Sequence, residues 1–121
     1  MAKKISILIV DDEESVRDSL YNWFVEDGFR VECAENARKA LSVLESDTFD
    51  IILADIKMPG MDGLEMLRRI KEIKADAIVI VMTAFATVDT AVKALKDGAY
   101  DYVTKPFDPE DRKSTRLNSS H

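Results

Sequence analysis

The sequence predicts an α/β fold in which a five-stranded parallel sheet, with strand order 2-1-3-4-5, is doubly wound by helices. Short runs rich in Ile, Val and Leu alternate along the chain with segments whose apolar residues recur at helical spacing. Gly, Pro, Asn and Asp fall between the two kinds of segment, where turns are needed. Strands that are joined through helices run parallel, because each right-handed crossover returns the chain to the same end of the sheet.

The strands are predicted from the apolar runs. Several of these runs carry no polar residue at alternate positions, which is typical of strands that are buried on both faces of a sheet. The expected strands are Ile5–Val10, Phe29–Ala34, Ile51–Ala54, Ala77–Met82 and the shorter run Tyr102–Val103.

Four helices are predicted between these strands, because each connecting segment carries an apolar stripe on one helical face. The stripes comprise Val16, Leu20 and Trp23 or Phe24; Ala37, Ala40, Leu41 and Leu44; Leu64, Leu67 and Ile70; and Val88, Ala91, Val92 and Leu95. Asn36 is the expected N-cap of the second helix, and Pro59-Gly60 with Asp62-Gly63 forms the turn before the third. Gly28 and Gly98 are expected to end the first and fourth helices.

At 121 residues the chain is expected to form one domain with a buried core. Its composition is that of a soluble globular protein, and no apolar stretch approaches the roughly 18–20 residues that a membrane span requires. No secretory leader is expected, because the apolar run after Met1–Lys4 is short and ends in two acids. The single cysteine, Cys33, predicts a core residue and a reducing, cytoplasmic setting. The net charge of −6 argues against direct nucleic-acid binding.

Residues 111–121 depart from this pattern. They contain one large apolar residue, Leu117, and no helical stripe, although the fold calls for a fifth helix to cover one face of the sheet. The segment reads like the in-frame translation of a sequencing-adapter oligonucleotide; the alternative is a disordered polar terminus. We expect residues 1–110 to form the domain and residues 111–121 to be a non-native, poorly packed tail, with the fifth helix missing or replaced. The only histidine, His121, then carries no functional weight, and marginal stability or self-association is expected.

Side chains that can handle phosphate follow four of the apolar runs. They are Asp11 and Asp12 after the first strand, Asp55 after the third, Thr83 after the fourth and Lys105 after the fifth. The carboxyl ends of parallel strands share one edge, and this strand order opens a crevice there between the first and third strands. Three carboxylates in the crevice repel one another, which raises their affinity for a divalent cation, and hard oxygen ligands favour Mg²⁺. A competing interpretation of Asp12 is an N-cap for the helix that starts near Glu13.

Asp55 is the candidate nucleophile. A carboxylate at a strand end that faces a metal can attack phosphorus and form an acyl phosphate. Phosphoryl transfer is catalysed mainly by positioning and charge neutralisation, so a hydroxyl and a cation are the remaining parts. Thr83 and Lys105 fit these roles, although a strand-end Thr is more often structural and a Lys is usually a solvated charge. Lys105 gains specificity from Pro106, because a cis Lys-Pro bond would fix the ammonium toward the site.

Four motifs occur in order: Val-Asp-Asp-Glu at 10–13, Asp55 followed by Met-Pro-Gly-Met-Asp-Gly at 58–63, Met-Thr-Ala at 82–84 and Lys-Pro-Phe at 105–107. Together they resemble the receiver domain of bacterial two-component response regulators, from Lys4 to about Pro109. The resemblance implies a flavodoxin-like receiver fold, a resident Mg²⁺ and Asp55 as the phosphoacceptor. It further implies Asp12 as a direct metal ligand, Asp11 as an acid that acts largely through water, and the backbone carbonyl of Lys57 as another ligand.

The resemblance also implies a switch. Thr83 matches the switch hydroxyl, Lys105 matches the phosphate-binding lysine, and Tyr102 matches the aromatic switch residue. A competing interpretation of Tyr102 is a half-buried aromatic of the sheet. Phosphorylation of Asp55 would draw Thr83 inward and vacate space for Tyr102, which biases the surface made by the fourth helix and the fifth strand. Such a protein is not an enzyme. It is a phosphoacceptor switch that assists its own phosphoryl transfer and dephosphorylation.

The implied partners are a sensor histidine kinase and an output domain, absent from this chain, that controls transcription. Exposed residues of the first helix, such as Arg17, Asn22 and Glu26, are the expected kinase contacts. Residues 85–107 look like receivers of the NtrC-like class, which precede an ATPase domain and a DNA-binding domain. The sequence leaves open whether the chain forms a homodimer.

Two other functions compete with this one. An aspartyl-phosphate hydrolase of the haloacid-dehalogenase type would want a second Asp two residues beyond the nucleophile, where this chain has Lys57. A receiver-like interaction module that works without phosphorylation would normally have lost Asp55, an acid of the pair or Lys105, and all of them are intact.

Overall fold

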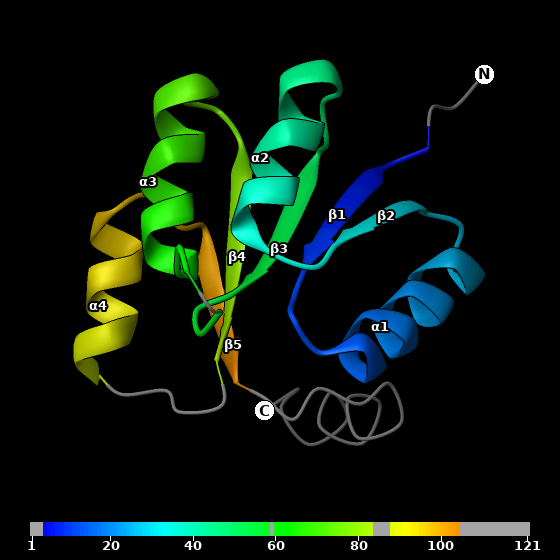
Figure 1. Ribbon diagram of the computed structural model, residues 1–121, viewed down its shortest axis with the longest axis horizontal. Coiled ribbons are helices and arrows are strands. Elements are labelled where there is room, and N and C mark those ends of the chain that lie inside the picture. The colour runs from blue at the N-terminus through cyan, green and yellow to red at the C-terminus, as the bar shows by residue number, and fades with distance from the viewer. Residues whose placement is uncertain (1–3, 59, 84–87, 105–121) are drawn as a thin grey trace, which may run out of the picture.

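The computed structural model describes residues 4–58, 60–83 and 88–104, which form a five-stranded parallel sheet with helices packed on it (Figure 1). The strand order is β2-β1-β3-β4-β5, so the predicted doubly wound topology is confirmed. The strands are β1 (Ser6–Val10), β2 (Arg30–Ala34), β3 (Ile51–Asp55), β4 (Ile78–Thr83) and β5 (Asp101–Thr104), and the helices are α1 (Glu14–Glu26), α2 (Ala37–Ser46), α3 (Gly63–Ile73) and α4 (Val88–Lys96). The predictions for a fifth helix and for the tail at 111–121 concern residues outside these ranges.

The strand β1 lies inside the sheet between β2 and β3. Its Ile9 is in register with Cys33 on one side and Leu53 on the other. All five residues of β1 are buried, because helices cover both faces of the sheet at this point. A continuous apolar run suits such a strand, since each fully buried Ile, Leu or Val side chain contributes about 1.5–3 kcal/mol to folding.

The helices form two unequal layers. On one face, α2, α3 and α4 each bury a side chain in the same core: Leu44, Leu67 and Ala94 respectively. On the other face, α1 buries Leu20 and Phe24 against the sheet. Within the described part of the chain, no helix has both the length and the hydropathy needed to cross a membrane.

The helices α1, α2 and α3 differ in how their N-termini are capped. The side chain of Asn36 accepts a hydrogen bond from the N–H of Lys39 at 2.8 Å, which confirms the predicted N-cap of α2. Asp62 caps α3 in the same way. By contrast, α1 begins after Glu13, whose side chain makes no capping bond. The interpretation of Asp12 as an N-cap is therefore wrong, and its carboxylate is left for another role.

A polar clamp joins β1 to β3 at the opposite edge of the sheet. The N–H and the hydroxyl of Ser6 both donate to Oδ2 of Asp50, at 2.8 and 3.1 Å. The N–H of Asp50 in turn donates to the Ser6 hydroxyl oxygen at 3.0 Å. Hydrogen bonds to a charged acceptor contribute more than neutral ones, so this clamp stabilises the pairing of the two strands.

Replacing Asp50 with alanine is expected to lower the free energy of unfolding by about 2 kcal/mol, because both Ser6 donors lose their charged acceptor. Urea unfolding followed by circular dichroism measures this change. Asp76→Ala, at an exposed carboxylate ahead of β4, is the control and is expected to change the free energy by less than about 0.5 kcal/mol. Equal losses in the two variants would show that the clamp contributes nothing.

Candidate metal and phosphoryl site

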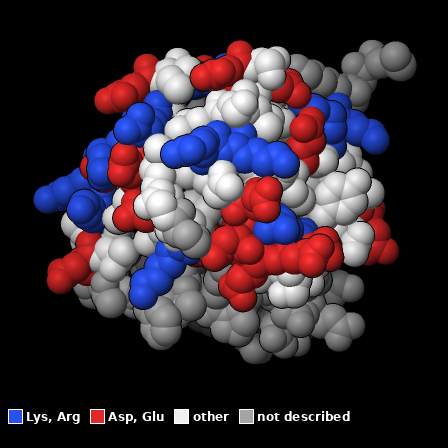
Figure 2. Space-filling view, in the orientation of Figure 1, with Lys and Arg blue, Asp and Glu red and all other residues white. Residues whose placement is uncertain are grey.

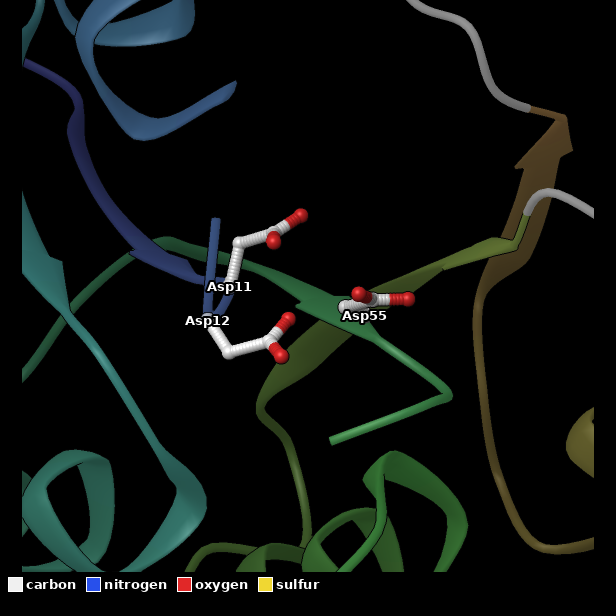
Figure 3. A group of neighbouring side chains, drawn as sticks. All are labelled: Asp11, Asp12 and Asp55. Carbon is white, nitrogen blue, oxygen red and sulfur yellow. The ribbon is translucent and has the colours of Figure 1, made fainter. Parts of the chain in front are cut away.

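Three carboxylates converge at the carboxyl edge of the sheet. Asp11 and Asp12 directly follow β1, and Asp55 is the last residue of β3. These strands are neighbours, with Val10 in register with Ala54. One oxygen from each of the three carboxylates lies within 4.8 Å of the others, and Figure 3 shows the side chains gathered between the two strand ends.

Backbone hydrogen bonds hold two of these acids in place. Asp11 is fully buried, and its Oδ1 accepts from the N–H of Glu13 at 2.9 Å. Asp55 is also buried, and its Oδ1 accepts from the N–H of Lys57 at 3.2 Å. Asp12 is exposed to solvent. The site therefore has two fixed carboxylates inside the fold and one at the surface.

Asp12 also borders two open depressions. One, of about 520 Å³, is lined by Asp12, Ile56, Lys57, Met58 and Asp62. The other, of about 350 Å³, is lined by Asp12, Glu35, Asn36, Ala37, Arg38, Gly60 and Met61. Figure 2 shows Asp and Glu side chains gathered near the junction of β1 and α1 on this face. The negative charge and the open approach suit a cation that exchanges with solvent.

The loop after Asp55 is packed against the site by a glycine. Gly63 opens α3, and its N–H donates to the carbonyl of Ile56 at 2.8 Å. A Cβ at this position would collide with the carbonyl oxygen of Asp55 and would lie 2.8 Å from the Cα of Ile56. Only glycine allows the helix to start this close to the backbone that carries the candidate nucleophile.

The donor set fits Mg²⁺. Three carboxylates with oxygens this close create mutual repulsion that a divalent cation relieves, and hard oxygen ligands are those that Mg²⁺ prefers. Lys57, whose backbone carbonyl is the further expected ligand, lines the depression next to Asp12. The carboxylates placed to hold the ion are therefore those of Asp11, Asp12 and Asp55, and Lys57 stays an expected ligand.

The other predicted site residues are described in part. Thr83 ends β4 and is buried, one residue beyond Met82, which is in register with Asp55. Tyr102 is half-buried in β5 and packs against the core under α2, α3 and α4, as its interpretation as a sheet aromatic requires. Lys105 and the Lys105-Pro106 bond lie outside the described residues.

One residue of α1 lies elsewhere than the sequence suggested. Asn22 and Glu26 are exposed, as expected of kinase contacts, but Arg17 is half-buried and its Nη1 donates to the backbone carbonyl of Asp11 at 2.8 Å. Sequence reasoning missed this contact and also the close packing at Gly63. The only signal for Arg17 was its place one turn inside the helix that follows the acid pair.

A doubly wound sheet with acids at the crevice between β1 and β3 defines the class of flavodoxin-like α/β domains with a cation-binding edge. The structure of TrrA from Thermotoga maritima, solved in complex with Mg²⁺-BeF, is similar to this one with a TM-score of 0.79 and 33% identity, over 94% of this chain and 97% of that chain. The sequence of residues 7–115 matches the family model of the response regulator receiver domain, and the chain belongs to this family of signalling switches.

Two curated relatives define the subclass. The regulatory protein AtoC of Escherichia coli is 49% identical over 102 residues, and the DNA-binding transcriptional regulator NtrC of Salmonella typhimurium is 43% identical over 102 residues. Both matches cover 84% of this chain but only 22% of the relative. The predicted likeness to NtrC-like receivers is confirmed, and the chain spans about a fifth of the length of these regulators.

Proposed function

We propose that this chain is a phosphorylation-dependent switch that accepts a phosphoryl group on Asp55 from a sensor histidine kinase, with Mg²⁺ as cofactor. The convergence of the Asp11, Asp12 and Asp55 carboxylates at the β1–β3 crevice is the observation that carries the proposal. Membership of the receiver family and the likeness to AtoC and NtrC support it.

Asp55 is suited to the role of nucleophile. Its Oδ1 accepts the Lys57 N–H, which fixes the orientation of the carboxylate at the strand end. An oxygen of Asp55 forms a bond to phosphorus as the P–N bond of the donor phosphohistidine breaks, and the electron pair stays on the imidazole nitrogen. Bound Mg²⁺ supplies charge neutralisation for the phosphoryl oxygens. Thr83 and Lys105 donate to those oxygens in the product.

The switch output passes to the surface of α4 and β5. Movement of Thr83 toward the phosphoryl group leaves room for Tyr102 to turn inward. Val92 and Leu95 of α4 are exposed apolar side chains, which are available to a partner surface. The partner is an output domain beyond this chain that controls transcription, by analogy with the regulatory protein AtoC and the transcriptional regulator NtrC.

The remaining parts of the proposal concern setting and extent. The kinase contacts the exposed side of α1 at Asn22 and Glu26, and the switch works in the cytoplasm, where transcription is controlled. It is no enzyme with a separate substrate, although it assists its own dephosphorylation. Residues 1–110 act as the receiver, and residues 111–121 take no part in it.

The test is the intact mass of the chain after incubation with acetyl phosphate and Mg²⁺, beside a sample with chelator. We expect one added phosphoryl group that is absent from the chelator sample, because the carboxylate cluster needs the cation to admit an anion. No adduct from a sample that circular dichroism shows to be folded would identify a phosphorylation-independent module. Catalytic release of phosphate without an adduct would identify a hydrolase.

A further inference from the structure

Three hydrogen bonds fix the residue that begins the acid pair. The N–H of Asp11 donates to the carbonyl of Ala34 at the end of β2, at 3.2 Å. Its side-chain Oδ1 accepts from the N–H of Glu13, and its carbonyl oxygen accepts from Nη1 of Arg17 at 2.8 Å. The third bond is the only one of these made by a side chain that reaches back from α1. It acts on the peptide unit that links Asp11 to Asp12.

The orientation of that peptide unit decides where Asp12 points. Asp12 is exposed, so burial in the core does not hold its carboxylate as it holds those of Asp11 and Asp55. A rotation of the Asp11 carbonyl would carry the Cα of Asp12 with it and would move its carboxylate relative to the other two. We infer that Arg17 is a positioning residue for the metal site, which holds the Asp11–Asp12 peptide so that the three carboxylates face one cation.

The charge of the guanidinium also reaches the neighbouring strand β2. Burial raises the pKa of the Cys33 thiol, and the positive charge of Arg17 partly opposes this by lowering it. Cys33 lies in β2, one residue before Ala34, whose carbonyl pairs with Asp11. The Arg17 side chain therefore lies along the inner side of α1, between the end of β2 and the turn that carries the acids, and is half-buried there.

The sign of the effect separates positioning from simple electrostatics. A guanidinium next to a cation site repels the cation, so charge alone predicts that removing Arg17 tightens Mg²⁺ binding. Positioning predicts the opposite, because groups that orient metal ligands typically change metal affinity by about 10–100-fold when they are removed. The inference rests on the proposed metal site and adds a residue that the acid motif does not include.

The experiment measures the Mg²⁺ dissociation constant of the 121-residue chain by isothermal titration calorimetry, with thermal unfolding in chelator as the measure of folding. We expect Arg17→Ala to weaken Mg²⁺ binding about tenfold. Arg17→Gln removes the charge but retains an N–H donor, and is expected to bind within about threefold of the wild type. Arg68→Ala is the charge control, because Arg68 lies on α3 and pairs with Asp97, and its affinity is expected to be unchanged.

Each outcome bears on the inference. Unchanged or tighter Mg²⁺ binding by folded Arg17→Ala overturns it. If Arg17→Ala does not fold, the comparison is between Arg17→Gln and Arg17→Leu. Weaker Mg²⁺ binding by Arg17→Leu than by Arg17→Gln supports positioning, and equal Mg²⁺ binding by the two variants overturns it. A wild type that binds no Mg²⁺ overturns this role together with the proposed metal site, whereas a wild type that binds Mg²⁺ leaves the test on Arg17 alone.

Discussion

Replacing Asp55 with asparagine is expected to reduce phosphoryl incorporation by more than about a hundredfold, because an amide oxygen lacks the charge that makes the carboxylate a nucleophile. The buried side chain keeps its size, and its oxygen can still accept the Lys57 N–H that Oδ1 of Asp55 accepts. The fold is therefore expected to persist. Intact mass after incubation with acetyl phosphate and Mg²⁺, compared at equal times, measures the loss.

Asp62→Asn is the matched control for this change. Asp62 lies in the same loop and lines the depression beside Asp12, but its side chain caps α3 by accepting from the N–H of Glu65. Asparagine caps helices about as well as aspartate, so incorporation is expected to stay within about twofold of the wild type. Retained incorporation in Asp55→Asn would assign the phosphoryl group to another residue and would overturn the role of Asp55 while leaving the family unchanged.

Gly63→Ala is expected to lower the free energy of unfolding by about 2 kcal/mol. Alanine favours a helix over glycine by roughly 1 kcal/mol, so propensity alone predicts stabilisation. The Cβ is fixed in place by the backbone of residue 63 and collides with the backbone carbonyl of Asp55, and overpacking of this kind costs about 3 kcal/mol when neither side can turn away. The collision outweighs the propensity, and phosphoryl incorporation is expected to slow as Asp55 shifts. Chemical unfolding and intact mass measure the two effects.

Gly28→Ala is the control that separates backbone strain from a steric collision as the cause of destabilisation when a glycine is replaced. Gly28 has φ of +92°, and a Cβ there would meet nothing within 4 Å. Its replacement costs about 1 kcal/mol through the left-handed backbone alone and is expected to leave incorporation unchanged. A loss at Gly63 no larger than the loss at Gly28, with normal incorporation, would show that the loop yields and that close packing beside Asp55 is not required.

The strands and the acid cluster could be predicted because both depend on chain order. A two-sided interior demands unbroken apolar runs, and Asp11, Asp12 and Asp55 follow such runs directly. Parallel topology then brings the strand ends together whatever the side chains do in detail. The weakest strand prediction was at the sheet edge, where β5 begins at the exposed Asp101 and ends at the exposed Thr104, outside the apolar pair that marked it.

Contacts that depend on side-chain reach or on a folded-back loop could not be predicted. The position of Arg17 in the helical pattern is that of an exposed residue. Only the path of its side chain brings the guanidinium to the Asp11 carbonyl. Gly63 reads as a turn signal, whereas its role follows from the approach of α3 to the Asp55 backbone. The competing interpretation of Asp12 as an N-cap failed for a related reason. The N–H of Glu13 is satisfied by the acid two residues before it, which leaves Asp12 outside the helix.

The exposure of Asp12 decides how the cluster is reached. Because one acid of the cluster lies at the rim of two open depressions, a hydrated ion could contact it without local unfolding and keep part of its water shell. A cation and a phosphodonor would then approach the cluster from the same open side, with no rearrangement of a helix or strand required.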